Sequence, residues 1–268
     1  MRIIKDIILK HFEYRKQVYK LAKTEFVKEN SNSVLGSFWN ILRPMILVFV
    51  YWFAVVIGLK VGDEISEYPY FLWLLIGIIP WFYISDMLKA GTNCLRKNSY
   101  LVTKMRFPIT LIPTFTNLSK LFTHLYLIAI AIVIYLAMGY KFSIYILQLP
   151  LYIILTFVFL NIWSYATAFI SAFSKDVFNL VKALITPLFW MSGIIWNVDK
   201  IDIEWLNTIL SINPITYLVS GYRSCFLEGK WFFEEPLQLG VFLGIIVVLG
   251  VIGVVSHKKL RRDIPDVL

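Results

Sequence analysis

Hydrophobic residues along this chain gather into long blocks that are almost free of charge, separated by short polar segments. At the 1.5 Å rise of an α-helix, a block of about 18 or more apolar residues is long enough to span about 30 Å of hydrocarbon. The blocks predict six transmembrane helices, near residues 40–59, 70–88, 109–138, 149–173, 180–197 and 237–256. The fold class that this pattern predicts is an all-α, polytopic membrane protein.

The N-terminal segment has a different pattern. Between residues 5 and 30, apolar side chains recur at roughly helical spacing and lysines and arginines lie between them. This pattern favours an amphipathic helix that lies in the headgroup region, although an ordinary solvated helix is an alternative. We therefore divide the chain into an N-terminal cytoplasmic or interfacial segment, residues 1–37, and a transmembrane domain, residues 38–268.

The segment before the last predicted span, residues 198–236, is too long for a turn and too apolar for a simple hydrated loop. Its apolar residues suggest two short helices that are broken at Asn213-Pro214, because the residue before a proline disfavours helical dihedral angles. We expect a short re-entrant or interfacial helical hairpin on the outer face. Non-helical backbone is tolerated at membrane depth only where protein or water satisfies its polar groups.

The distribution of basic residues predicts the orientation. Lysine and arginine are frequent in residues 1–37, 89–106 and 258–262 and sparse in the alternate connections, and basic segments stay on the cytoplasmic side. Both termini are therefore expected in the cytoplasm, and the protein in the cytoplasmic membrane. Cys94 and Cys225 then lie on opposite sides, where they cannot form an intramolecular disulfide. Thiol labelling is expected to reach Cys94 from inside and Cys225 from outside.

Composition agrees with a lipid environment, because 59% of the residues are hydrophobic and the mean hydropathy is +0.71. The net charge of +9 raises the question of nucleic acid. The basic residues stand in the short connections between apolar blocks, where they set membrane orientation, so nucleic acid is not expected as a partner.

No phosphate-binding loop of the form G-x-x-x-x-G-K-[ST] is present in the sequence. Any ATP-driven work therefore requires a partner subunit, and no cofactor or metal is expected in this chain. An intramembrane enzyme acting on lipid-linked sugars is an alternative, but it would require converging acids or a metal site near an interface. A scaffold or receptor is a third alternative, for which a folded soluble domain would be expected.

Four stretches carry a resemblance to a known family. Residues 35–44, LGSFWNILRP, resemble the L-G-x-x-W-x-x-L-x-P start of the first span in ABC-2 type permeases for polysaccharide and teichoic acid export. Residues 49–53, FVYWF, followed by 73–82, WLLIGIIPWF, resemble the teichoic acid branch in particular. Residues 98–108, NSYLVTKMRFP, are similar to the family's cytoplasmic coupling segment, and Asn213-Pro214 with Tyr222-Arg223 resembles its N-P-x7-Y-R signature.

This resemblance implies a permease that exports a lipid-linked polymer. It implies a homodimer that binds two ABC ATPase subunits, which hold the ATP and Mg²⁺, and an undecaprenyl-diphosphate-linked polymer as substrate, with membrane lipid around it. Wall teichoic acid is the first candidate for the polymer. O-antigen, capsule or another undecaprenyl-linked polysaccharide remains open, and a drug-exporting ABC-2 permease is third. The chain departs from the family pattern at Val34, Lys175-Asp176 and Ser192-Gly193-Ile194.

The segment of about residues 96–107 is the predicted coupling site. It combines apolar side chains with a cluster of like charges, as expected of a surface that docks on an acidic cleft of the ATPase. A basic loop that only sets topology is the alternative. The predicted coupling residues are Arg96, Lys97, Tyr100, Leu101, Lys104, Met105, Arg106 and Phe107.

Aromatic and ionisable residues within the spans are candidates for the substrate path, although most tryptophans are expected at interfaces or in packing. Flat aromatic faces can stack on sugar rings, and Arg43 can meet a lipid or substrate phosphate or extend to the interface. Lys120 and His124 share a helical face, and for His124 a buried hydrogen bond to a neighbouring helix is favoured over a proton relay. The predicted path residues are Arg43, Tyr51, Trp52, Trp81, Tyr83, Trp163 and Tyr165, and the predicted outer gate consists of Asn213, Pro214, Tyr222 and Arg223.

Overall fold

The computed structural model describes residues 2–29, 34, 36–60, 68–105, 107–261 and 263–268. These residues form helices joined by turns and loops, with no strand among them. The helices are α1 Arg2–Glu13, α2 Arg15–Lys28, α3 Trp39–Trp52, α5 Tyr70–Thr92, α6 Cys94–Lys97, α7 Ser99–Thr103, α8 Ile112–Ala137, α9 Leu149–Phe173, α10 Lys175–Trp190, α11 Glu204–Ile212, α12 Pro214–Arg223, α13 Pro236–Leu260 and α14 Ile264–Val267. Two π-helical segments, Phe53–Leu59 and Ser224–Glu228, continue α3 and α12.

Within the described part of the chain, five helices are long and apolar enough to cross a membrane: Trp39–Leu59, Tyr70–Thr92, Ile109–Ala137, Ile144–Phe173 and Pro236–Leu260. The prediction of an all-α, polytopic membrane protein is confirmed. The predicted span 180–197 corresponds to α10, which begins earlier because Ser174 caps its first turn by accepting a hydrogen bond from the Asp176 amide at 3.2 Å. With 16 residues, α10 is shorter than the other five. A sixth crossing therefore stays a prediction.

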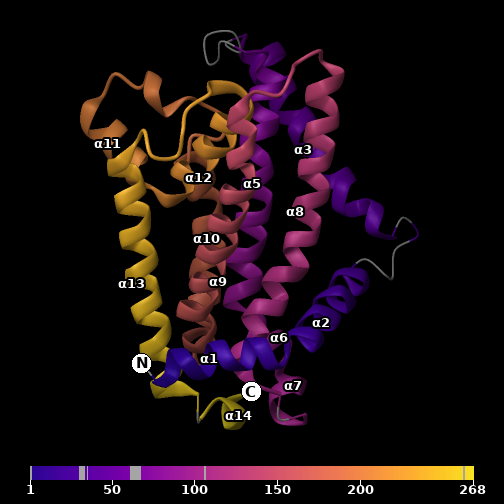
Figure 1. The fold of residues 1–268 in the computed structure, drawn as a ribbon, viewed down its shortest axis with the longest axis vertical. Helices are drawn as coiled ribbons and strands as arrows, with labels where there is room; N and C mark the ends of the chain where they lie inside the picture. Colours follow the sequence, from indigo (N-terminus) through magenta and orange to yellow (C-terminus); the bar gives the residue numbers. More distant parts are fainter. Residues whose placement is uncertain (1, 30–33, 35, 61–67, 106, 262) are drawn as a thin grey trace.

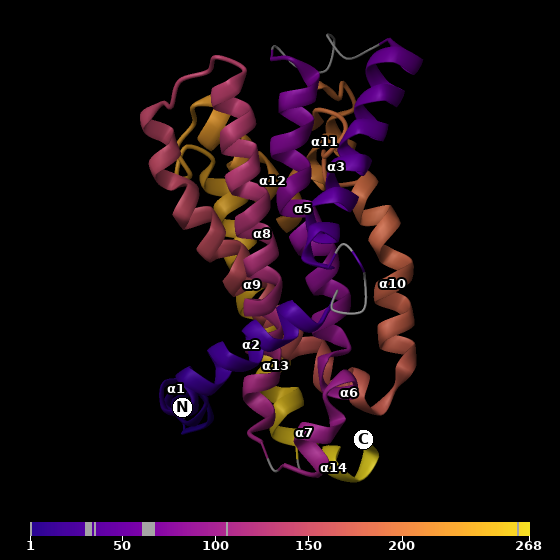
Figure 2. The same cartoon turned by 90° about the vertical axis from the view of Figure 1, so that its right-hand side faces the viewer.

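Helix α5 is the centre of the bundle (Figures 1 and 2). It packs against α3, α8, α9, α10 and α12, and most of its residues are buried. A helix that is apolar on all sides is stable only when other helices or lipid surround it. Because α5 runs from the end of the molecule that carries α11 to the end that carries α6, it gives a reference axis for the site.

The two ends of the molecule differ. Helices α1, α6, α7 and α14 and both chain ends lie at one end, and α11 lies at the other (Figure 1). The N-terminal segment forms two helices rather than one, interrupted at Tyr14, and α2 packs on α8. The aromatic ring of Phe26 in α2 lies 5.9 Å from that of Phe122 and 6.0 Å from that of Tyr126.

The segment before the last span contains the two short helices that the sequence predicts, α11 and α12, and they are separated at Asn213-Pro214. The Asn213 side chain caps α12 by accepting a hydrogen bond from the Ile215 amide at 3.0 Å. Residues 215–219 and 221–227 are buried, so α12 is part of the core. Its depth in the membrane stays a prediction.

Candidate functional site

A groove runs along α5 and consists of two adjoining cavities. The first, of about 350 Å³, lies among α2, α3, α5 and α8, and the second, of about 170 Å³, lies among α3, α5 and α10. Leu47 and Phe82 line both, so the two cavities lie next to one another. We call the first the charged cavity and the second the aromatic cavity.

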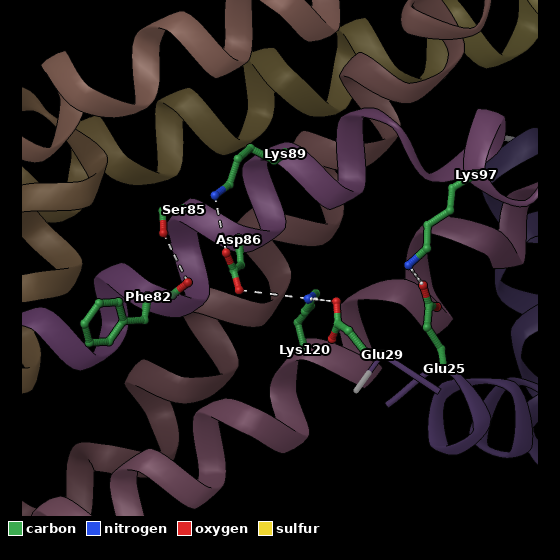
Figure 3. A network of polar contacts seen from close by, with 8 residues as sticks. All are labelled: Glu25, Glu29, Phe82, Ser85, Asp86, Lys89, Lys97 and Lys120. Carbon is green, nitrogen blue, oxygen red and sulfur yellow. Dashed lines mark hydrogen bonds and ion pairs between the residues drawn. The ribbon is translucent and has the colours of Figure 1, made fainter. Parts of the chain in front are cut away.

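The charged cavity contains basic and acidic side chains that come from four helices or their ends. The ammonium group of Lys120 in α8 forms an ion pair with the Glu29 carboxylate and lies 3.9 Å from an Asp86 oxygen (Figure 3). Asp86 also pairs with Lys89 one turn along α5, at 3.4 Å. An ionisable group within a span is costly unless it is paired or faces a cavity, and Lys120 meets both conditions.

Arg43 also lines the charged cavity, and its guanidinium lies over the Trp39 ring, 5.4 Å from the ring centre. Sequence reasoning predicted Arg43 as a path residue and singled out Lys120, but it missed Glu29 and Asp86. Asp86 carried a usable signal, because it is an acid inside the predicted span 70–88. Glu29 carried none, since its role depends on where α2 packs.

The aromatic cavity brings together Tyr51, Trp81, Phe189 and Trp190. The Phe189 ring lies 5.2 Å from that of Tyr51 and 5.5 Å from that of Trp81. Sequence reasoning did not name Phe189 and Trp190 as candidates for the path, and both stand at the end of α10. Aromatic faces in this arrangement can stack on flat faces of a ligand such as sugar rings.

The other predicted path residues separate into different environments. Tyr83 lines the charged cavity, and Trp52 packs at the edge of Phe71, with 6.3 Å between the rings. The structure does not bring Trp163 and Tyr165 into either cavity. The Trp163 indole donates to the Thr92 hydroxyl at 3.2 Å, and the Tyr165 hydroxyl donates to the Thr110 carbonyl, so both connect α9 to other helices.

A buried polar chain crosses the bundle next to the charged cavity. The Tyr83 hydroxyl donates to Asn117 Oδ1 at 2.5 Å, and the Tyr83 ring stacks on the His124 ring at 4.8 Å. His124 Nε2 lies 2.8 Å from the Tyr222 hydroxyl in α12. The predicted hydrogen bond from His124 to a neighbouring helix is therefore confirmed. It links the groove to the segment that carries the predicted outer gate.

The predicted gate residues form tight internal contacts. Asn213 Nδ2 donates to the Ser192 hydroxyl at 2.9 Å, and Pro214 begins α12. Arg223 is buried, and its guanidinium donates to the carbonyls of Gly193 at 2.7 Å and Ile194 at 2.8 Å. These contacts join α12 to the turn after α10. The gate role itself stays a prediction.

Comparison with known proteins decides the family. The family model described as ABC-2 type transporter matches residues 16–227. This chain belongs to the ABC-2 type transporter family. It is 22% identical over 262 residues to the O-antigen export system permease protein RfbA of Myxococcus xanthus, covering 97% of each chain. It is 22% identical over 242 residues to the protein of the same name from Klebsiella pneumoniae, covering 88% of this chain and 89% of the relative.

A third relative is similar over a shorter part. The putative transport permease ycf38 of Cyanophora paradoxa is 24% identical over 97 residues, or 33% of each chain. The family and the apolar helices together establish a multi-pass membrane protein. ABC-2 permeases are transporter subunits that work with ABC ATPase partners in export systems.

In this ABC-2 family member, some of the predicted coupling residues bind other parts of the same chain, and others remain exposed. Arg96 donates from Nε to the Ser171 carbonyl at 2.7 Å and from Nη2 to the Ala172 carbonyl at 2.8 Å, which satisfies the last turn of α9. Lys97 pairs with Glu25 at 2.7 Å. Both cations therefore bind their own chain.

The apolar coupling residues divide in the same way. Leu101 and Phe107 are partly buried against a core to which α2, α6, α8 and α9 contribute. Tyr100 and Met105 remain 66% and 61% exposed, and Lys104 is exposed. Arg106 lies outside the described residues. The exposed subset is the part that can contact an ATPase, and the coupling role stays a prediction.

Proposed function

We propose that this chain is the permease subunit of an ABC exporter that moves a lipid-linked cell-surface polysaccharide across the cytoplasmic membrane. ATP is hydrolysed by a partner subunit that also binds the Mg²⁺, since the chain lacks a phosphate-binding loop. The observation that carries the proposal is the groove along α5, in which a charged cavity lies next to an aromatic one.

The two halves of the groove suit the two chemical parts of such a substrate. Arg43 and Lys120 provide positive charge for a phosphate or diphosphate. Tyr51, Trp81 and Phe189 provide flat aromatic surfaces for sugar rings. A small apolar drug has no group that would pair with these charges, so we rank a drug exporter lower.

The proposed assembly is a homodimer with two ABC ATPase subunits. The groove is lined on one side by α3. The side chains of α3 and of its π-helical continuation are largely exposed in the single chain, including Phe49, Val50 and Phe53. A second copy that packs on this face would cover it and enclose the path. Both chain ends lie at the α6 end (Figure 1), which supports termini on one side of the membrane and a sixth crossing by α10.

Two polymers fit this proposal equally. The motif combination of residues 49–53 and 73–82 favours wall teichoic acid, and the permeases that are similar over nearly the whole chain are named for O-antigen export. In both cases the proposed substrate is a polymer on a diphosphate-linked lipid, so the chemistry of the groove does not distinguish the two polymers.

The test is a reconstitution of the purified chain with its ABC ATPase in lipid vesicles. We expect ATP hydrolysis to be stimulated by the diphosphate-linked form of the correct polymer and not by the same polymer without its lipid. Teichoic acid and O-antigen substrates are compared side by side. Stimulation by small hydrophobic drugs alone would replace the proposal with a drug exporter, and ATP hydrolysis by the chain without a partner would place it among enzymes.

A further inference from the structure

The ion pair between Lys120 and Glu29 joins a membrane-spanning helix to the N-terminal segment. Lys120 lies inside the apolar helix Ile109–Ala137, eight residues after the start of α8, and its side chain is 13% exposed. A carboxylate from the N-terminal segment, 91 residues away in sequence, neutralises it. Such a contact holds α2 against the span and fills the positive part of the charged cavity.

The two carboxylates next to Lys120 are not equivalent. Asp86 belongs to α5 and has a second cation, Lys89, at 3.4 Å. Glu29 lies directly after α2, where its amide donates to the Glu25 carbonyl at 3.1 Å. The C-terminal end of a helix carries partial negative charge, which disfavours a carboxylate there. Glu29 can therefore leave Lys120 by a movement of the end of α2, whereas Asp86 is part of α5 and remains paired with Lys89.

The balance of charges in the charged cavity shows what the departure of the Glu29 carboxylate would leave. The lining of the charged cavity contains Arg43 and Lys120 against Glu29 and Asp86, which is neutral in sum. Without Glu29, two positive charges face one negative charge, and Asp86 is shared with Lys89. Oxygen atoms of an anion can then take the place of the Glu29 carboxylate on Lys120.

We propose that Lys120 and Arg43 form a diphosphate-binding site, and that Glu29 occupies it as an internal competitor when no substrate is bound. Binding of the diphosphate group of a lipid-linked substrate displaces Glu29 and frees the end of α2 from α8. This inference rests on the proposed function for the identity of the ligand. The cavity of about 350 Å³ is within the usual size of ligand sites, about 300–1,000 Å³.

The displacement is a local event. Helix α2 stays attached through Phe26, which contacts Phe122 and Tyr126, and through the pair between Glu25 and Lys97 at 2.7 Å. Glu29 lies beyond the last residue of the helix, so only its side chain and the end of α2 need to move. Glu29 and the diphosphate compete for the same ammonium group of Lys120 and repel one another, so binding of one disfavours the other, while Asp86 remains paired with Lys89.

The experiment measures binding of farnesyl diphosphate, a short soluble analogue, to the purified full-length chain in lipid nanodiscs. Glu29→Gln is expected to raise the affinity about tenfold, a size typical of coupling between two sites. Glu25→Gln is the matched control, because it removes the same charge one turn earlier in the chain and breaks the pair with Lys97 instead. It should leave the affinity within about twofold of the parental value, well below a typical coupling effect.

Further arms test the site and the ligand. Lys120→Met and Arg43→Gln should each weaken binding in the parental and the Glu29→Gln background, with folding checked by size-exclusion profile and melting temperature. Farnesol, which has no phosphate, should not bind. Inorganic diphosphate distinguishes a free phosphate from a lipid headgroup, and we expect it to bind more weakly than farnesyl diphosphate and to show the same dependence on Glu29.

The results separate this inference from the proposed function. If Glu29→Gln and Glu25→Gln change the affinity equally, or if Lys120→Met binds as the parental chain does, the competition by Glu29 is wrong. If polymer stimulates ATP hydrolysis but the affinity for the diphosphate ligand does not depend on Glu29, only this inference is overturned. Binding that follows the predicted pattern without any polymer-stimulated hydrolysis would overturn only the proposed function.

Discussion

The guanidinium of Arg223 lies over the ring of Trp73, with 3.3 Å between its central carbon atom and the ring centre. Two carbonyls from the turn after α10 accept its hydrogen bonds at 2.7 and 2.8 Å. Gly77, one turn along α5 from Trp73, leaves the space that the guanidinium fills. A single buried cation therefore joins α5, α12 and the end of α10.

Replacement of Gly77 by alanine tests this relationship. A Cβ atom at this position would overlap the Arg223 guanidinium, so the cation must leave its carbonyl partners. We expect a loss of about 1–3 kcal/mol of stability, as for other overpacked sites, measured as a lower melting temperature in detergent. Gly244→Ala is the control, because its Cβ atom meets nothing within 4 Å, and a melting temperature lowered equally by both would contradict the account.

Substitutions of Arg96 and Lys104 are expected to affect the stability of the protein differently, although both residues belong to the predicted coupling segment. Arg96→Gln removes charged hydrogen bonds to the end of α9, which are worth about 1.5–3 kcal/mol each, and should lower the melting temperature. Lys104→Gln changes an exposed side chain and should leave it unchanged. Equal melting temperatures for the two variants would show that Arg96 does not cap α9.

The exposed pair Tyr100 and Met105 is expected to contact the ATPase. Aspartate at both positions places unpaired charge in an interface, where it is costly. We expect normal insertion into the membrane, with weakened retention of the ATPase in co-purification. The control places aspartate at Phe233 and Leu237, which are exposed in the chain segment near the start of α13. A double variant that keeps its ATPase and exports at the parental rate would refute the coupling role.

Both cysteines are buried, which corrects the expectation that each is labelled from its own side. Burial, and next the Glu25 carboxylate, raise the pKa of the Cys94 thiol above its usual range. We expect no reaction with maleimide until the protein is denatured. Topology is better tested with new cysteines at exposed Tyr100 and Phe233 in a background without Cys94 and Cys225. Labelling of both new cysteines from one side would contradict the three crossings, by α8, α9 and α10, that are predicted between them.

The raised pKa of Cys94 also predicts a pH dependence. The unfolded thiol ionises above its ordinary pKa of about 8.5, whereas the folded thiol stays protonated. The contribution of this group to stability is therefore fully present below that pH and decreases as the pH rises through the alkaline range. The stability difference between the parental chain and Cys94→Ala should shrink between about pH 8.5 and 10 in denaturant titrations. A constant difference would contradict this.

The aromatic cavity is tested by leucine at Tyr51 and Phe189. Leucine keeps the groove apolar but removes the flat faces, so we expect slower polymer export with little change in the amount of folded protein. Phe242→Leu is the control, since Phe242 is buried against Phe159 and Tyr217 outside both cavities. Equal rates of export by the double variant and the control would show that stacking of Tyr51 and Phe189 on the polymer is not needed for transport.

The sequence by itself determined the class of the protein and the order of its elements. Apolar blocks without charge can be stable only in lipid, so the all-α, polytopic fold follows from composition along the chain. The break between α11 and α12 follows from Asn213-Pro214, because capping and the restriction before proline are local effects. Motifs of neighbouring residues, such as residues 35–44, were sufficient to indicate the family.

Only the tertiary structure decided which side chains meet. Helix α5 is apolar all round, so its sequence has no periodicity that shows which face looks into the groove. Trp163 and Trp81 are both tryptophans in spans, yet one binds α5 backbone and the other lines the aromatic cavity. Glu29 and Lys120 are 91 residues apart, and their pairing depends on how α2 packs on α8. Contacts between distant segments are set by packing across the whole bundle, which no local pattern encodes.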